Sequence, residues 1–182
     1  MKKSVITFII LGLIIVLIIG GLFYKNMADN SPQKVLLETN YGNITIELRA
    51  DQPITAGNFA NLVKKGTYNG VIFHRIIPKF MIQGGDPTGT GYGDRSIPMI
   101  KDEFNGVQKN NRGTLAMANA GPNTGSSQFF INLVNNNFLD NRHPVFASVV
   151  EGMDVVDKIA AVETDRNDKP LKPVTIISAK VL

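Results

Sequence analysis

The sequence contains no cysteine and no tryptophan, and it has only two histidines among its 182 residues. The absence of cysteine excludes disulfide bonds, cysteine-ligated zinc and cysteine nucleophiles. The two histidines, His74 and His143, are too few for a zinc site, which needs at least three good ligands. We therefore expect no metal site.

Excess charge is also scarce once the amino-terminal segment is set aside. The formal net charge is +4, but residues 1–34 hold four lysines against one aspartate, which leaves only +1 for the rest of the chain. The basic pI of about 9.3 therefore arises mainly from the flanks of one apolar run. Because no basic stripe exists elsewhere, we expect no nucleic-acid partner.

That apolar run covers residues 5–24 and reads VITFIILGLIIVLIIGGLFY, without a charged residue. A helix of this length is about 30 Å long, which matches the hydrocarbon core of a bilayer. Lys2 and Lys3 precede the run, Lys25 follows it, and Tyr24 stands where an aromatic ring would meet the lipid headgroups. The pattern predicts a transmembrane anchor over residues 1–25, held in the lipid bilayer through residues 5–24.

A cleavable signal peptide is the alternative interpretation of the same segment. Such peptides share the basic start but have a shorter apolar region, followed by a small-x-small cleavage site. The possible sites are poor here, because Ala28 follows Asn26 and Gly21 follows Ile19 at the critical spacing. The lysine distribution favours an internal amino terminus, so we expect the remaining domain on the extracytoplasmic side of the cell membrane. The polar residues 26–34 predict a short linker.

Residues 35–182 have the length of one globular domain rich in short strands. Two helices are predicted, one capped by Thr55 and ended by Gly66, the other over Met153 to Val162. The remaining apolar runs are too short for helices, and they predict strands at residues 35–39, 43–48, 71–77, 80–83, 115–118, 129–133, 145–150 and 174–181. Many strands with glycine-rich joints favour a mostly β fold, an antiparallel sheet that closes into a barrel.

Two motifs in this domain suggest other chemistry and fail on closer reading. The run GGDPTGTGYG, residues 84–93, lacks the Gly-Lys-Ser/Thr of a phosphate-binding loop, and no helix signal follows it. Ser126 and Ser127 are not in a Gly-x-Ser-x-Gly elbow and have no evident acid–base partner, so serine hydrolysis has little support.

The richest stretch is FHRIIPKFMIQGGD, residues 73–86. On a strand, Arg75 shares a face with Phe73 while His74 points to the other, and Pro78 then turns the chain. Taken alone, such an arginine is typical of a surface salt bridge. Three further segments change that interpretation: LAMANAGPNTGSSQFFINL at 115–133, FLDNRHPVF at 138–146, and the glycines around Gly89.

Together these segments resemble the cyclophilin family of peptidyl-prolyl cis-trans isomerases, over residues 35–182. The resemblance implies a closed eight-stranded antiparallel barrel capped by two α-helices. It also implies a metal-independent, non-covalent enzyme that needs no cofactor and acts on proline-containing polypeptides. It assigns the catalytic arginine to Arg75, with His74, Phe80 and Gln83 also in the catalytic group. Its substrate-binding residues fall on Met81, Gly89, Ala118, Asn119, Gln128, Phe130, Phe138, Leu139 and His143.

One departure from the family pattern concerns Phe138. Many eukaryotic members have a tryptophan there that contacts the drug cyclosporin, so we expect weak cyclosporin binding with catalysis retained. The segment at residues 93–104 resembles the family's rim loop and should influence which residues beside proline are accepted.

The resemblance and the anchor together predict a monomeric foldase for chains near the membrane. The rival from another class is a catalytically weak proline-peptide binding or scaffold module of the same fold.

Overall fold

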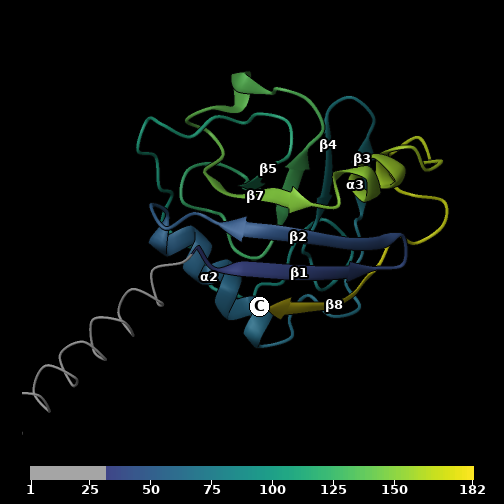
Figure 1. The fold of residues 1–182 in the computed structure, drawn as a ribbon, viewed down its shortest axis with the longest axis horizontal. Helices are drawn as coiled ribbons and strands as arrows, with labels where there is room; N and C mark the ends of the chain where they lie inside the picture. Colours follow the sequence, from purple (N-terminus) through teal and green to yellow (C-terminus); the bar gives the residue numbers. More distant parts are fainter. Residues whose placement is uncertain (1–31) are drawn as a thin grey trace, which may run out of the picture. The chain divides into compact units, whose positions relative to one another are not determined.

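The computed structural model describes residues 32–182, and Gln33–Leu182 form one compact unit. Within these residues there are two α-helices, a short 3-10 helix and eight strands (Figure 1). The helices are α2 (Pro53–Lys64), α3 (Met153–Ala160) and η1 (Asn137–Leu139). The strands are β1 (Lys34–Thr39), β2 (Gly42–Leu48), β3 (Arg75–Ile77), β4 (Met81–Gly84), β5 (Thr114–Met117), β6 (Phe129–Asn132), β7 (Val145–Glu151) and β8 (Ile176–Val181).

All eight strands belong to one antiparallel sheet with the order β3-β4-β6-β5-β7-β2-β1-β8. The predicted mostly β fold with eight antiparallel strands and two helices is confirmed. The predicted barrel closure is looser than expected. No strand ladder joins β3 to β8 in the described part of the chain. The two ends of the curled sheet are linked instead by the bridge between Ile72 and Thr175 and by backbone hydrogen bonds between residues 70–73 and 174–176.

The predicted strand over residues 71–77 is too long for a physical reason. Its first half bonds to the segment before β8, where the Phe73 N–H donates to the Val174 carbonyl oxygen at 2.8 Å. Its second half, Arg75–Ile77, pairs instead with β4. The segment therefore changes partners around His74, and this change leaves β3 only three residues long.

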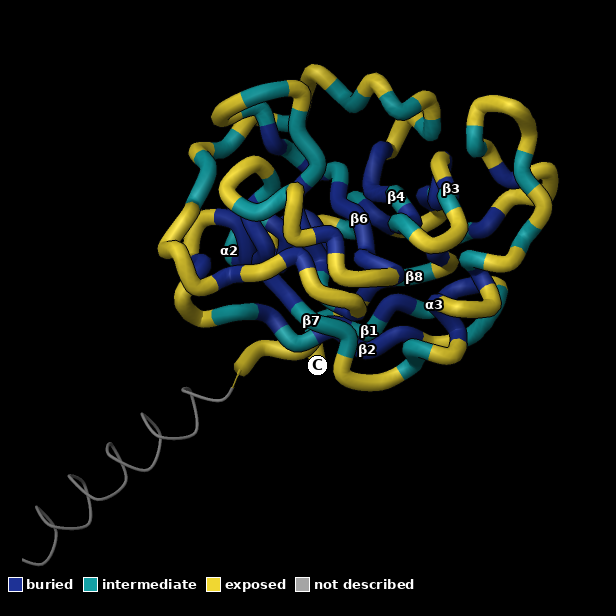
Figure 2. The backbone as a smooth tube through the Cα atoms, turned by 90° about the horizontal axis from the view of Figure 1, so that it is seen from above, coloured by how far each residue is buried: buried dark blue, intermediate teal, exposed yellow. Residues whose placement is uncertain are grey.

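The main core is built from buried residues of α2, α3 and one face of the sheet, and Figure 2 shows buried segments along the strands in the interior. Its centre is aromatic: Phe59 of α2 lies 5.3 Å from Phe129 and 5.0 Å from Tyr68, measured between ring centroids. The Tyr68 hydroxyl donates to the Ser127 carbonyl oxygen at 3.0 Å, which satisfies its one buried polar group. Burial raises the pKa of the Tyr68 hydroxyl far above its ordinary value, so it stays a neutral donor.

The amino terminus of α2 is capped by a residue that sequence reasoning did not find. We predicted Thr55 as the cap, but the helix begins at Pro53, and the buried Thr55 hydroxyl has no hydrogen-bond partner. Instead the Glu103 carboxylate accepts from the Ile54 N–H at 3.1 Å and from the Thr55 N–H at 2.6 Å. Glu103, which is distant in sequence, thus accepts the N–H groups that a local cap would otherwise bind, and its negative charge complements the helix dipole. The predicted helix end is confirmed, because Gly66 has a φ of 71° just after the last turn.

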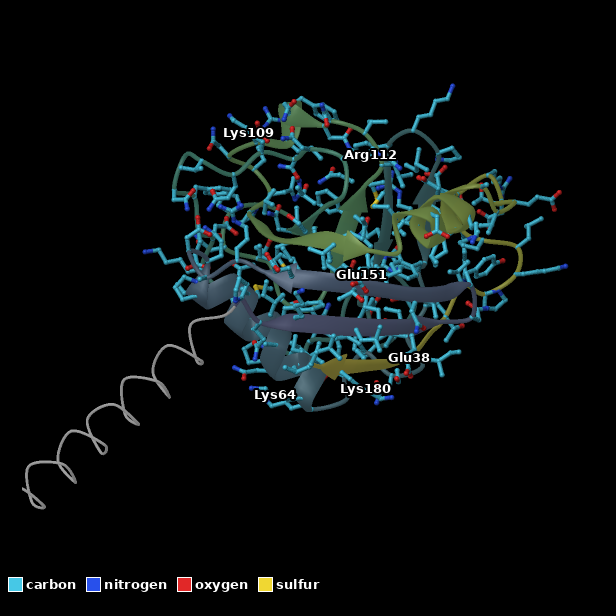
Figure 3. All side chains as sticks on the ribbon, viewed as in Figure 1. Glu38, Lys64, Lys109, Arg112, Glu151 and Lys180 are labelled. Carbon is cyan, nitrogen blue, oxygen red and sulfur yellow. The ribbon has the colours of Figure 1, made fainter. Side chains whose placement is uncertain are left out.

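At the far edge of the sheet, Glu38 of β1 faces Lys180 of β8, and the two labelled side chains lie close together in Figure 3. The Lys180 ammonium lies 3.1 Å from a Glu38 carboxylate oxygen, and Ser178 donates to the same carboxylate. The hydrogen bond from Ser178, followed by that from Lys180, lowers the pKa of Glu38. This ion pair lies on the surface of the sheet, at β1 and β8.

The predicted transmembrane span at residues 5–24 lies outside the described residues. Among residues 32–182, none of the helices is both long enough and apolar enough to cross a bilayer. Lys34, the last residue of the predicted linker, is the first residue of β1.

Candidate active site

A second, smaller apolar cluster lies on the other face of the sheet from the main core. Its buried members are Met81, Ala116, Phe130 and Val145, and Ile77, Phe80, Ala118 and Leu139 pack around them partly buried. Strand alternation produces this division, because neighbours along the same strands, such as Ile82, Phe129 and Ile131, belong to the main core. Phe129 therefore packs in the main core, whereas its neighbour Phe130 belongs to the second cluster.

Aromatic contacts shape the border of this cluster. The rings of Phe130 and His143 meet edge to face at 5.4 Å, and His143 Nδ1 lies 3.0 Å from the Met117 carbonyl oxygen. On the other side, Phe138 stacks on Phe80 with ring centroids 5.9 Å apart and planes inclined by 18°. Phe138 is 66% exposed, so its outer ring face is open to solvent. These rings border the apolar cluster on two sides.

Strand register places Arg75 beside this cluster. Arg75 of β3 is directly opposite Gln83 of β4, and Gln83 is directly opposite Phe130 of β6. Side chains of directly opposed residues project to the same face of a sheet. A half-exposed guanidinium, an amide and a buried aromatic ring therefore follow one another across three neighbouring strands.

The predicted peptide-holding side chains gather around one cavity of about 480 Å³. Gln83, Ala118, Asn119 and Gln128 line it, together with the rim loop between Gly91 and Met99. The Gln83 amide Nε2 donates to Gln128 Oε1 at 2.9 Å, and Gln128 Nε2 donates to the Gly91 carbonyl oxygen at 3.0 Å. Asn119 Nδ2 donates to the Arg142 carbonyl oxygen at 2.8 Å, so its side chain anchors its own loop.

A second cavity of about 500 Å³ lies on the other side of Gln83. His74, Arg75, Gln83 and Gly89 line it, joined by residues 165, 167 and 169 of a carboxyl-terminal loop. Gln83 borders both cavities, whereas His74 and Arg75 line only the second. The structure thus brings all thirteen predicted site residues into one region made of the apolar cluster and these two flanking cavities.

His74 differs from the other polar site candidates in being almost fully buried. Burial lowers the pKa of its imidazole, Asp86 partly opposes this effect, and the nearby Arg75 and Lys169 cations add to it. Its Nδ1 atom has no hydrogen-bond partner. A neutral imidazole next to the Arg75 guanidinium avoids a second positive charge at the site.

Asp86 was not predicted as a site residue, although its fully buried carboxylate organises the glycine-rich loop beside Arg75. It accepts from the Gly91 N–H at 2.7 Å, the Gly93 N–H at 3.1 Å and the Thr88 N–H at 2.9 Å. Burial by itself raises the pKa of Asp86, but hydrogen bonds from Thr88 and from both glycine N–H groups outweigh it, so the pKa lies below its ordinary value. No sequence motif indicated that Asp86 organises this loop.

Asp168 was missed as well. Its carboxylate Oδ2 lies 3.5 Å from Arg75 Nε, although 93 positions separate the two residues in the sequence. Among residues 32–182, no group of three or more histidine, cysteine, aspartate or glutamate side chains is arranged to hold a metal ion. The chemistry that the site can offer is therefore a cationic donor beside an apolar surface, with amides at its edge.

Comparison with known proteins decides what kind of site this is. Residues 34–181 match the family model described as cyclophilin type peptidyl-prolyl cis-trans isomerase. The chain belongs to the cyclophilin family. Over 152 residues it is 49% identical to the peptidyl-prolyl cis-trans isomerase ppi1 of Schizosaccharomyces pombe, covering 81% of this chain and 98% of that protein. The isomerase CYP18-2 of Arabidopsis thaliana is 45% identical, with 85% and 96% of the two chains covered.

Solved structures agree with this membership. A cyclophilin-type isomerase of Cryptosporidium parvum superposes with a TM-score of 0.80 at 34% identity, covering 84% of this chain and 98% of that chain. The same Cryptosporidium protein in the presence of the dipeptide Ala-Pro gives a TM-score of 0.79 at 35% identity, with 82% and 99% covered. The predicted family and the predicted enzyme class, a peptidyl-prolyl cis-trans isomerase, are confirmed.

Proposed function

We propose that this cyclophilin seats the proline ring of a substrate on the cluster around Phe130, and that Arg75 is its main catalytic group. The observation that carries this proposal is the register of β3, β4 and β6, which lines up Arg75, Gln83 and Phe130 on one face. A proline ring on Phe130 would then lie beside the amide Gln83 and within reach of the guanidinium.

The reaction explains why an arginine is suited to this place. Rotation about a peptide bond faces a barrier of about 18 to 20 kcal/mol, because the nitrogen shares its lone pair with the carbonyl group. In the twisted transition state this sharing is lost, so the proline nitrogen can accept a hydrogen bond. A donor at Arg75 then stabilises the twisted state more than either planar state, which is the condition for catalysis. Arginine stays charged and presents a rigid fork of N–H groups, which lysine does not.

The remaining groups would hold the peptide while one side of it turns. The proline ring of the substrate would be enclosed by Phe130 together with Met81, Phe80, Leu139 and His143. Gln83, Ala118, Asn119, Gln128 and the rim at Gly89 line the two cavities where the flanking peptide would lie. Fixing one side of the bond against the other turns binding into orientation, and no covalent step is needed. His74 would support the site from below rather than touch the nitrogen.

A protease-coupled assay with a proline-containing peptide tests this proposal against the binding-module alternative. Residues 33–182 suit the experiment, because they have their own core and match nearly the whole length of ppi1. Both an isomerase and a binding module would bind the peptide, but only an isomerase would accelerate the cis–trans exchange of its proline bond. Exchange at the uncatalysed rate would leave only the binding module.

We further propose that residues 5–24 hold the enzyme at the cell membrane with its domain outside the cytoplasm, where it would assist the folding of exported chains. The proposal is supported by the uncharged run and its flanking lysines. Protease added to intact cells should digest the domain, and a cytoplasmic control protein should survive. A domain that resists until the cells are lysed would contradict the outward orientation.

Cyclosporin should inhibit this enzyme only weakly, because Phe138 stands where many relatives have a tryptophan. Phe138 stacks on Phe80 and lacks the indole N–H that a tryptophan would offer to a ligand. Replacing Phe138 with tryptophan should lower the inhibition constant about tenfold, the value of one net hydrogen bond of about 1.4 kcal/mol. Inhibition constants measured with the parent and the F138W variant check this. A nanomolar constant for the parent would contradict it.

A further inference from the structure

A hairpin loop at residues 164–170 lies against the catalytic edge of the sheet and is closed by its own hydrogen bonds. A bridge joins Thr164 to Pro170 at its base. Within it, the Asp165 carboxylate accepts from the Asn167 N–H at 2.8 Å and from the Lys169 N–H at 3.0 Å. The Asp168 N–H donates to the Asp165 carbonyl oxygen at 3.1 Å. These bonds fix the shape of the loop without help from a ligand.

The loop is attached to the sheet beside Arg75. The Ile76 N–H donates to the Asp168 carbonyl oxygen at 2.8 Å, so the backbone of Asp168 is bound to the residue after Arg75. Asp168 has a φ of 63°, in the left-handed region that aspartate and asparagine enter more readily than most residues. The anchored backbone and this local turn together direct the Asp168 carboxylate toward Arg75 Nε, at 3.5 Å.

The value of this ion pair as a stabilising contact is small. Both side chains are more than 40% exposed, and exposed pairs of this kind contribute little to the free energy of unfolding. Its geometric effect is larger, because an arginine side chain has several rotatable bonds and a free guanidinium samples many positions. A carboxylate at Nε restrains the guanidinium and leaves its two terminal nitrogens available to another partner.

The nearby acidic group cannot substitute for Asp168. Asp165 lines the same cavity as Arg75, but its carboxylate accepts from two N–H groups of its own loop. Lys169 also lines this cavity and carries the same charge as Arg75. In the described part of the chain, Asp168 is the one carboxylate within ion-pair distance of Arg75.

We propose that Asp168 is a positioning residue, which holds the Arg75 guanidinium in the orientation that donates to the proline nitrogen. The inference rests on the proposed role of Arg75. Since the oriented guanidinium acts in the twisted transition state, loss of Asp168 should lower kcat and leave KM nearly unchanged. Small misplacements of a catalytic group are sufficient for effects of one to two orders of magnitude.

The test compares two substitutions at the same position. Glycine accepts the left-handed backbone and removes the carboxylate, whereas asparagine accepts the backbone and keeps an oxygen acceptor. Asp168→Gly should lower kcat about tenfold, and Asp168→Asn should stay within about threefold of the parent. The exposed Asp154, paired with Lys158 on α3, provides a matched control, and Asp154→Asn should change neither constant. Urea unfolding verifies that the variants fold.

A double-mutant cycle with Arg75→Lys separates this inference from the assignment of Arg75. In the R75K background, Asp168→Gly should cause no further loss, because the Nε contact no longer exists. Equal losses in both backgrounds, equal losses for glycine and asparagine, or an Asp168→Gly variant with parental kcat would each overturn the role of Asp168. Full activity of R75K and R75A themselves would instead overturn the role of Arg75.

Discussion

Replacing Arg75 with alanine should lower kcat/KM for a proline peptide by about 10² to 10³-fold, the cost of removing one preorganised donor from a transition state. The loss should fall on kcat, because the planar ground state does not offer the nitrogen lone pair that Arg75 binds. The apolar cluster that would hold the ring does not include Arg75, so binding of the peptide should persist. Isomerisation kinetics at substrate concentrations spanning KM measure both constants.

The same substitution should leave folding intact. The Arg75 side chain is 45% exposed and its one ion-pair partner in the described residues is the exposed Asp168. Substitutions of such surface groups change the free energy of unfolding by no more than about 0.5 kcal/mol. Arg166→Ala, an exposed arginine at the tip of the hairpin loop, is the matched control and should retain parental activity. Activity of R75A within about threefold of the parent would remove Arg75 from the mechanism.

Much of this site could be predicted because its groups lie in short, contiguous segments. Arg75, Phe80, Met81 and Gln83 fall within nine residues, and the strand–turn–strand pattern around Pro78 already places Arg75 and Gln83 near each other. The positions of the strands were also readable, since strand periodicity and glycine-rich turns are local signals. The family resemblance then supplied the pairing of distant segments, which periodicity alone does not specify.

Two of the missed groups, Glu103 and Asp168, each act on a segment far away in the chain. Glu103 caps a helix 48 residues before it, and Asp168 reaches Arg75 across 93 residues. A carboxylate on a loop carries no periodic signal, and its partner is determined only when the loop is folded against the sheet. For the same reason the local sequence predicted Thr55 as the cap, whereas the distant Glu103 side chain accepts the N–H groups at the start of the helix.

Asp86 is the second position where a large effect is expected, and the effect begins with stability. Asparagine has almost the same shape, but one carboxylate oxygen becomes an NH₂ donor. Whichever oxygen is replaced, the new donor faces a backbone N–H, either that of Thr88 or those of Gly91 and Gly93. A buried donor left without an acceptor costs about 1 to 3 kcal/mol. With the loss of the charge-assisted bonds, Asp86→Asn should lower the free energy of unfolding by about 2 to 4 kcal/mol.

Catalytic activity should also fall in D86N, because a chain of hydrogen bonds through the loop connects Asp86 to the site. The Gly91 N–H binds Asp86, its carbonyl oxygen binds Gln128, and Gln128 binds Gln83 opposite Arg75. We expect kcat/KM to drop about tenfold in D86N at temperatures where the variant is folded. Asp154 is the control, since its carboxylate is exposed on α3 and pairs with Lys158 outside the site. D154N should keep parental activity.

The pH dependence of the free energy of unfolding tests whether the charge on the Asp86 carboxylate causes the loss of stability in D86N. The pKa of Asp86 in the folded protein lies below its ordinary value, so the charged form contributes stability that is complete above the unfolded pKa of about 4. This contribution is lost as the pH falls through the lower pKa of the folded state. Urea unfolding of the parent and of D86N should therefore show a full difference near pH 6 that shrinks below about pH 4. A difference that stays constant over this range would mean that Asp86 does not act through its charge.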